Sequence, residues 1–442
     1  MKKFLSIGIL AFLLYGCGPG NTGELTGVRG RKSFSEPQPL GMVFIPMGSF
    51  TLGSNDQDVA WGINAPTKTV SVDAFWMDQT EITNNQYRQF VYYVRDSIGR
   101  RLLGEINDEF LITEDQFGNP LDPPVLNWDI PIDMEDEEQL EALGALYYSK
   151  EDELFGRKEI DTRKLFFEYY WIDIKQAAQK RNRYNYETLS YDQGEVINSL
   201  GEKVKVDNRQ SFIMRDKVNV YPDTLCWVAD FTYAFNEPYT NSYFWHPAFD
   251  NYPVVGVTWK QATAFCIWRT QTLNKFLAPR GITIQDYRLP IEAEWEYAAR
   301  GNLNHSMYPW GGPYTRNLEG CFLANFKPLR GNYVDDGGLI PLPVGTYEPN
   351  DYGLYDMAGN VAEWTSNAYD ESAYSFIHDM NPDYKYNAKP SDLPALKRKV
   401  VRGGSWKDIS YFLQVGSRTY EYQDSAKSYI GFRCVRSYLG AN

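Results

Sequence analysis

The chain of 442 residues has few histidines and too little positive charge for several classes of function. Its 3 histidines, His246, His305 and His378, are far apart in the sequence, which argues against a non-haem iron site with closely spaced histidine ligands. Lysine and arginine total 44 against 57 acidic residues, a net charge of −13. Nucleic-acid binding requires a basic surface that displaces counterions from phosphates, so we expect no DNA or RNA partner.

Internal repeats and disorder-promoting composition are also absent. Without a repeat of fixed period, a solenoid or propeller is not expected. Charged residues make up 23% of the chain and aromatic residues 16%, a balance typical of a folded protein with a large core. Acidic residues do gather at 133–138, which we interpret as a solvated helix start, the alternative being a docking surface for a basic partner.

The N-terminus has the pattern of an export signal. Lys2 and Lys3 precede an apolar run, Phe4 to Leu14, that is too short to span a bilayer as a permanent helix. Gly16-Cys17 then resembles a bacterial lipobox, which predicts a signal peptide over 1–16 and acylation of Cys17. Residues 17–38 are rich in Gly, Ser, Thr and charge and are interpreted as a lipidated tether to the membrane. The alternative is an ordinary signal peptide with an unrelated cysteine.

Cysteine is scarce, with 5 in the whole chain. If Cys17 is acylated, the remaining four are Cys226, Cys266, Cys321 and Cys434. An exported chain can keep disulfides, and four cysteines allow three pairings. The spacing alone does not choose among them.

Short runs of β-branched and aromatic residues at 42–50 and 70–77 predict strands. Apolar residues at helical spacing predict a helix over 80–94 with Thr83 as N-cap, and another that Thr258 caps and that runs to Leu273. A further helix is predicted between Pro290 and Gly301.

The stretch from 97 to 245 is predicted to be a folded insertion. We expect a helix over 161–182 and strands at 203–206 and 211–220. Aromatic residues are concentrated there, and such side chains either form a protein interface or pack the insertion onto the core. They are Tyr169, Tyr170, Trp171, Tyr184, Tyr186 and Tyr191.

Five ordered motifs carry a family resemblance. They lie at Met42–Phe50, Val254–Trp259, Arg288–Gly301, Asn350–Trp364 and Arg402–Val435. In this order they resemble the formylglycine-generating enzymes, or sulfatase-modifying factors. The resemblance implies a loop-rich α+β fold related to C-type lectins, with a core of 39–96 and 246–442 interrupted by the insertion 97–245.

The chain differs from that family at the residues on which the family's catalysis depends. Its oxidases carry a copper-binding cysteine pair shortly after Gly-Gly-Ser, and here the matching residues are Asp408 and Leu413. Copper(I) prefers thiolate ligands, which neither side chain can replace. Ala362 also replaces a tryptophan usual in the family. We therefore expect no catalytic residues, no catalytic cofactor and no enzyme activity.

The resemblance further implies structural features. It implies a disulfide between Cys266 and Cys434, whereas Cys226 and Cys321 are left open between free thiols and a bridge. It implies structural Ca²⁺ held by the side chains of Asp356 and Glu363 with the carbonyls of Gly359 and Val361. A second calcium set comprises Asn325, the Phe326 carbonyl, Asp336 and the Gly338 carbonyl. In the alternative, Glu363 pairs with an arginine and no metal binds.

Three arginines, Arg402, Arg418 and Arg433, are predicted to serve the fold rather than a substrate. A guanidinium has five donors, so buried arginines can satisfy turn carbonyls and acids such as Glu292 and Glu294.

The lipobox, the end of the insertion and the motifs after it together resemble a narrower group. This is the GldK (PorK) and, less closely, GldJ lipoproteins of gliding motility and type IX secretion in Bacteroidetes bacteria. The resemblance implies an outer-membrane lipoprotein facing the periplasm that self-associates in a ring with a GldN (PorN)-type partner. The alternatives are a glycan- or peptidoglycan-binding module and a formylglycine-generating oxidase.

Overall fold

The structure is a computed structural model that describes residues 36–54, 65–115, 117–133, 135–192, 194–199, 201–233, 238–329 and 331–440. The predicted signal peptide and Cys17 lie outside these ranges. The elements below all belong to one compact unit, Gln38–Tyr438. No helix in the described ranges is long and apolar enough to cross a membrane.

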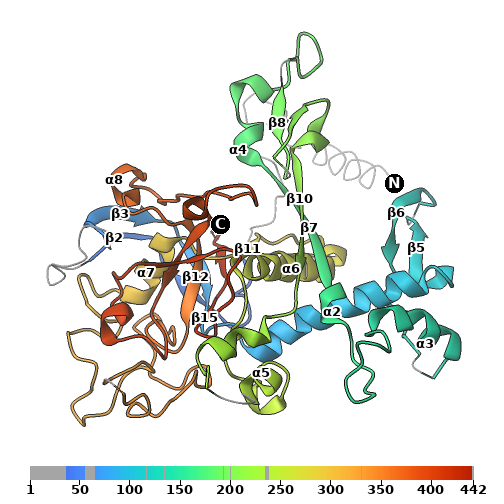
Figure 1. Ribbon diagram of the computed structural model, residues 1–442. Helices are drawn as coiled ribbons and strands as arrows, with labels where there is room; N and C mark the ends of the chain where they lie inside the picture. Colours follow the sequence, from blue (N-terminus) through green and yellow to red (C-terminus); the bar gives the residue numbers. More distant parts are fainter. Residues whose placement is uncertain are drawn as a thin grey trace, which may run out of the picture. The chain divides into compact units, whose positions relative to one another are not determined.

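Two four-stranded sheets form the centre of this unit (Figure 1). The first has the order β1 (Met42–Ile45), β4 (Phe75–Asp78), β16 (Val435–Ser437) and β11 (Tyr287–Arg288). The second has the order β14 (Thr419–Tyr422), β13 (Arg398–Arg402), β12 (Ala362–Ala368) and β15 (Ile430–Gly431). A separate antiparallel pair joins β2 (Gly48–Leu52) to β3 (Lys68–Val72). The strands predicted at 42–50 and 70–77 are therefore confirmed.

Helices α2 (Asn84–Leu103) and α6 (Trp259–Leu277) begin at capping boxes. Thr83 accepts a hydrogen bond from the backbone N–H of Gln86, and Thr258 does the same for Gln261, so both predicted N-caps are confirmed. The two helices pack together around a core of aromatic rings. Tyr87 and Phe265 stack there with ring centroids 5.6 Å apart.

Helix α7 (Glu292–Arg300) is buried along its whole length, because it contacts β2 and β3 as well as β12 and β13. It ends at Gly301, whose φ of 56° lies in the left-handed region that a glycine adopts without strain. Its N-cap is Ile291, so Pro290 precedes the helix rather than occupying its first turn. The remaining C-terminal helix is the short α8 (Ala373–Phe376).

The insertion is folded, and its elements are small. They are β5 (Leu111–Glu114), β6 (Pro120–Leu126), α3 (Glu137–Leu143), β7 (Phe166–Ile172), α4 (Ile174–Ala177), β8 (Glu195–Ile197), β9 (Lys203–Lys205), β10 (Ile213–Asn219) and α5 (Pro238–Ser242). The predicted strands at 203–206 and 211–220 are confirmed by β9 and β10. Asp136 caps α3, as the solvated helix start at 133–138 predicted.

The helix predicted over 161–182 is wrong. Residues 166–172 form strand β7, which pairs antiparallel with β10 over its whole length. Two aromatic side chains of β7, Phe167 and Tyr169, are buried on one face, while Phe166 and Tyr170 on the other face are exposed. Burial that alternates from one residue to the next is the pattern of a strand, and aromatic residues favour strands. The pairing of β7 with β10 therefore determined the structure, although the spacing of the apolar residues also fits a helix.

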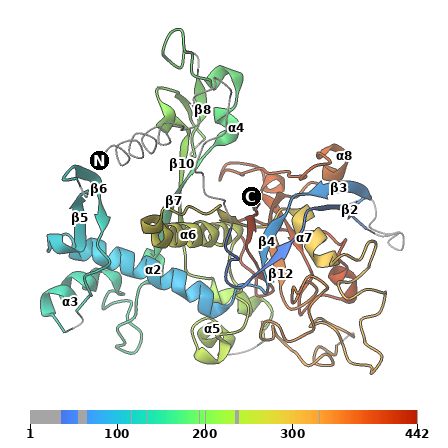
Figure 2. The same ribbon diagram turned by 180° about the vertical axis from the view of Figure 1, so that it is seen from behind.

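The insertion also shares the main hydrophobic core. Leu165, Phe167 and Val220 lie in the same buried cluster as Tyr87 and Phe265. Helix α2 continues through the predicted boundary at 97 and ends at Leu103. Figures 1 and 2 show β7 and β10 side by side, reaching from the α6 side of the core. The insertion is therefore an extension of the core and not a separable domain.

Candidate functional site

The two positions that the resemblance matches to the family's copper-binding pair hold residues with structural roles. Leu413 lies in the 3-10 helix Ser410–Leu413 and is 0% exposed. It packs in a small cluster with Tyr308, Phe326 and Ala358. This position contributes packing and offers no ligand atom.

Asp408 closes the turn after the Gly-Gly-Ser motif. Its carboxylate accepts a 2.5 Å hydrogen bond from the Ser405 hydroxyl, and its N–H donates to the Ser405 carbonyl at 2.9 Å. Its own carbonyl accepts from the N–H of Lys327. Burial raises the pKa of Asp408 above its usual value. The carboxylate thus holds a loop together, where the family's oxidases use a thiolate.

Four cysteines lie in the described ranges, and two of them are adjacent. The Sγ atoms of Cys266 and Cys434 are 3.3 Å apart in a fully buried site, and both residues are thiols in this structure. A disulfide bond requires about 2.05 Å between the sulfurs, so the bond itself stays a prediction. Cys226 is a buried thiol and Cys321 an exposed one.

A buried group of carboxylates surrounds Arg433. Both oxygens of Glu363 accept hydrogen bonds from this guanidinium, and Glu363 also accepts from the Trp295 indole N–H at 2.8 Å. Glu363 therefore follows the arginine-pairing alternative and has little capacity left for calcium. Asp356 lies nearby with its pKa raised to about 6, mainly because burial disfavours its charge.

Glu81 belongs to the same group, although it lies in no motif that points to a site. It is 0% exposed, and its carboxylate accepts from the Asn360 amide and from the Val361 N–H. Burial and then the charge of Asp356 raise its pKa well above the usual value. The only sequence signal was an acid two residues before the N-cap Thr83, in a segment otherwise interpreted as the start of a helix.

In the second predicted calcium set, the Asp336 side chain contacts the backbone of two other members. The carboxylate of Asp336 accepts from the N–H groups of Phe326 at 2.6 Å and Gly338 at 3.2 Å. Nearby, the side-chain oxygen of Asn325 is buried without a hydrogen-bond partner in the described structure. A buried side-chain oxygen without a partner is the kind of ligand that a hard cation takes. No group of three or more His, Cys, Asp or Glu side chains suited to a metal occurs in the described part of the chain.

The other predicted fold arginines are confirmed as structural. Arg402 is 1% exposed and bonds Glu296 at 2.6 Å, Glu292 at 3.0 Å and two backbone carbonyls. Arg418 pairs with Glu292 at 2.6 Å. Glu294, expected to join them, instead pairs with Arg288 at 2.6 Å.

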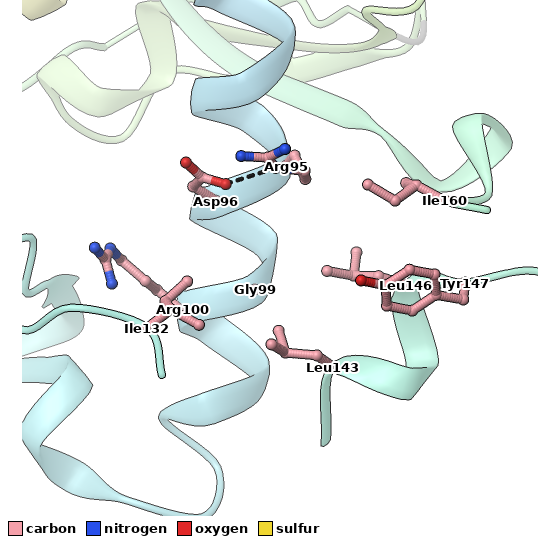
Figure 3. Close-up of a pocket in the computed structure, with 9 residues that line it drawn as sticks. All are labelled: Arg95, Asp96, Gly99, Arg100, Ile132, Leu143, Leu146, Tyr147 and Ile160. Atoms are coloured by element: carbon pink, nitrogen blue, oxygen red, sulfur yellow. Dashed lines mark hydrogen bonds and ion pairs between the residues drawn. The ribbon is translucent and has the colours of Figure 1, made fainter. Parts of the chain in front are cut away.

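A pocket of about 350 Å³ lies in the insertion, between α2 and the segment that follows α3 (Figure 3). Gly99 lies at its centre, with Leu143, Leu146 and Ile160 on one side. Ile132 and the stem of Arg100 lie on the other side, and an Arg95–Asp96 ion pair of 2.7 Å lies above it (Figure 3).

Because Gly99 has no side chain, α2 can pack closely against the aliphatic side of the pocket. A Cβ atom at Gly99 would come within 3.2 Å of a Leu143 methyl group and 3.7 Å of a Leu146 methyl group. The pocket therefore has an aliphatic floor and a charged rim, which suits one apolar side chain better than a polar substrate.

The insertion's aromatic residues divide between packing and surface. Tyr169 is buried in the core and Trp171 packs partly against it. Tyr170 is 54% exposed and Tyr186 is 83% exposed. Tyr184 contacts Tyr186 and Tyr191 edge to face. The packing interpretation is confirmed for Tyr169 and Trp171, and for the exposed rings the interface interpretation stays a prediction.

Comparison with known proteins relates the chain to one enzyme family. It is 26% identical over 408 residues to the formylglycine-generating enzyme of Bos taurus, covering 91% of this chain and 76% of that protein. It is 34% identical over 190 residues to inactive C-alpha-formylglycine-generating enzyme 2 of Bos taurus, covering 42% of this chain and 50% of that protein.

Among solved structures, PvdO from Pseudomonas aeruginosa matches with a TM-score of 0.44 and 17% identity, covering 90% of this chain and 94% of that one. The model of the sulfatase-modifying factor enzyme 1-like domain matches residues 31–438. This match confirms the predicted family, and the sheets, helices and connecting loops described above confirm the mixed fold. The chain belongs to the family of proteins with a sulfatase-modifying factor enzyme 1-like domain.

Proposed function

We propose that this chain is a non-catalytic structural lipoprotein of the type IX secretion and gliding-motility machinery, of the GldK (PorK) type. In this proposal, acylated Cys17 anchors it to the outer membrane, facing the periplasm. It self-associates there in a ring with a GldN (PorN)-type partner.

The observation that carries the non-catalytic part is the use of Asp408 and Leu413. One holds a turn and the other fills a core cluster, which supports the proposal that the family's reaction is lost here. A relative whose name describes it as inactive, the Bos taurus enzyme 2, is consistent with a family whose fold can outlive its reaction. A chain without its family's chemistry is left with its surface as the means of function.

The pocket around Gly99 is the proposed partner site. It is concave and apolar, and it lies in the insertion, the part that we expect to serve interaction. Interfaces derive most of their affinity from a few apolar anchors seated in such pockets. We assign the pocket to an anchor side chain of the ring partner.

Calcium is proposed as a structural ion only. Asp356 and Asn325 fit the predicted ligand sets, and Glu81 fits better than Glu363 because the latter is committed to Arg433. When bound, the cation would neutralise buried carboxylates and hold loops together.

Electron microscopy of the detergent-extracted lipoprotein, with everything that co-purifies, tests the assembly role. The proposal predicts closed rings containing this chain and a second protein in fixed ratio. A chain that is extracted alone and shows no assembly would contradict it, as would one retained by purified peptidoglycan with no protein partner.

A further inference from the structure

The two outer edges of the β7–β10 pair differ. The bond from the Asp173 N–H to the Phe212 carbonyl and the bond from the Val220 N–H to the Leu165 carbonyl fix which residues face the partner strand. Because hydrogen-bonded pairs alternate in an antiparallel ladder, odd-numbered residues of β7 bond to β10. The backbone groups of Glu168, Tyr170 and Ile172 therefore point away from it.

The outer edge of β10 is closed by side chains. The N–H of Arg215 donates to the Ser199 hydroxyl at 3.0 Å, and the N–H of Lys217 donates to the Asp216 carboxylate at 2.9 Å. Edge donors that are already bonded cannot pair with an incoming strand. A second protein strand would therefore find few unbonded N–H groups along the outer edge of β10.

The outer edge of β7 is open. Within the described ranges, the N–H groups of Glu168, Tyr170 and Ile172 have no hydrogen-bond partner. Their face of the sheet carries three exposed apolar or aromatic side chains beside the charged Glu168, since Phe166 is 41%, Tyr170 54% and Ile172 63% exposed. An open edge beside exposed apolar side chains is a template for strand addition.

We propose that the open edge of β7 pairs antiparallel with the same edge of a second copy of this chain. A two-fold axis at Tyr169 places Glu168 opposite Tyr170 of the second copy and Phe166 opposite its Ile172. All of the outward-pointing groups then meet one another, because even-numbered residues face even-numbered residues.

The side chains of β7 support a second copy of this chain as the strand that pairs with the open edge. Glu168 is the single charged residue of β7, and it already pairs with Arg215 of its own sheet. Tyr170 donates its hydroxyl to Glu168 within one copy at 3.0 Å, so a tyrosine opposite this carboxylate in the dimer is also favourable. No like charges stand directly opposite, and the remaining exposed pair is apolar.

A two-fold contact closes at two copies, so it is distinct from the head-to-tail contacts that a ring requires. The inference rests on β7 and β10 alone, and it holds or fails independently of the secretion role.

The test uses two lysine substitutions at cross-strand neighbours. Ile172 and Ile213 are directly paired on the same exposed face, but Ile172 lies on the open edge and Ile213 on the closed one. The mass of the full chain in detergent, without partner, is measured by sedimentation over a range of concentrations for the wild type, Ile172→Lys and Ile213→Lys. We expect a concentration-dependent dimer whose Kd rises about tenfold or more in Ile172→Lys and little in Ile213→Lys.

Three results would overturn the inference. One is a wild-type chain that stays monomeric at every concentration, and another is equal weakening by both lysines. The third is a monomeric chain whose binding to a different co-purifying protein is lost only in Ile172→Lys, which would assign the edge to that protein.

Discussion

At the scale of single residues, Glu81 adds a further buried carboxyl group to the acids near Arg433. Glu81 and Glu363 are 0% exposed and Asp356 is 8% exposed, and one guanidinium, that of Arg433, bonds Glu363. Burying more negative than positive charge is costly unless protons or a cation compensate. The raised pKa values of Glu81 and Asp356 reflect this imbalance.

Calcium should therefore stabilise the fold through these residues. At a concentration about 100-fold above its Kd, a ligand of the native state adds about 2.7 kcal/mol. We expect the thermal midpoint to rise by several degrees when EDTA is replaced by calcium, and the rise to shrink in Glu81→Gln. The exposed Glu319→Gln serves as the matched control. Equal midpoints in calcium and EDTA would contradict the calcium proposal.

Lys399 predicts a pH dependence of stability. It is 1% exposed on β13, where its ammonium lies 3.8 Å from the Trp259 ring centroid and donates to the Tyr386 carbonyl at 2.7 Å. Burial, followed by the charges of Lys385 and Lys260, lowers its pKa from 10.5 to about 7. The folded state thus binds this proton more weakly than the unfolded chain does.

The direction of the pH dependence of stability follows from this difference in pKa between the folded and unfolded states. Between about pH 7 and 10.5 the unfolded chain holds more protons at Lys399, so the contribution of this residue to stability rises with pH. Below about pH 7, Lys399 is protonated in both states, so the destabilisation caused by burying its charge stays constant. The difference in unfolding free energy between wild type and Lys399→Met, measured by urea titration, should grow in favour of the wild type across that window. Parallel pH profiles would rule the explanation out.

At the scale of elements, the strands and helices of the core could be predicted because local signals agree with tertiary packing. Thr83 and Thr258 each begin a capping box, and the apolar stripes behind them face one core. The segment 161–182 could not be predicted in this way. Its apolar residues fit a helical spacing and a strand alternation, and only the pairing of β7 with β10 selects the strand.

Some residues of the candidate sites could be predicted from the sequence, and others could not. Asp356, Asn325 and the pair Cys266 and Cys434 follow from the resemblance to the family, which assigns a role to each position. Glu81 and Gly99 do not, because a buried acid and a pocket depend on what other segments bring beside them. Such sites become visible only when residues far apart in the sequence are placed together.

The pocket at Gly99 makes a prediction for element α2. In Gly99→Leu the Cβ atom alone comes within 3.2 Å of Leu143, so that side chain must shift, and the rest of the new side chain occupies the pocket. Partner binding should therefore weaken about tenfold or more. Gly144→Leu is the matched control, since a Cβ atom there meets nothing within 4 Å and the residue has a helical φ of −52°. Pulldown of the partner by each variant, with thermal unfolding to confirm folding, measures the effect. Equal binding by both variants would place the partner elsewhere.

At the scale of the whole molecule, the insertion and the family core fold as one unit. Residues Gln38–Tyr438 form a single compact body, and Phe167 of the insertion contacts Phe90 of the core with ring centroids 5.2 Å apart. Removing the insertion would expose that core, so point substitutions test function more cleanly than deletion.

The central claim is that this fold has lost the family's thiol oxidation and acts through its surface. Asp408 and Leu413 hold structure where copper(I) would need thiolates.

The most direct test incubates the copper(I)-treated protein with a cysteine-containing sulfatase-type peptide and measures the product by mass spectrometry. An active formylglycine-generating enzyme run in parallel is the positive control. The account predicts an unchanged peptide thiol, whereas conversion of that thiol to an aldehyde over repeated turnovers would contradict it.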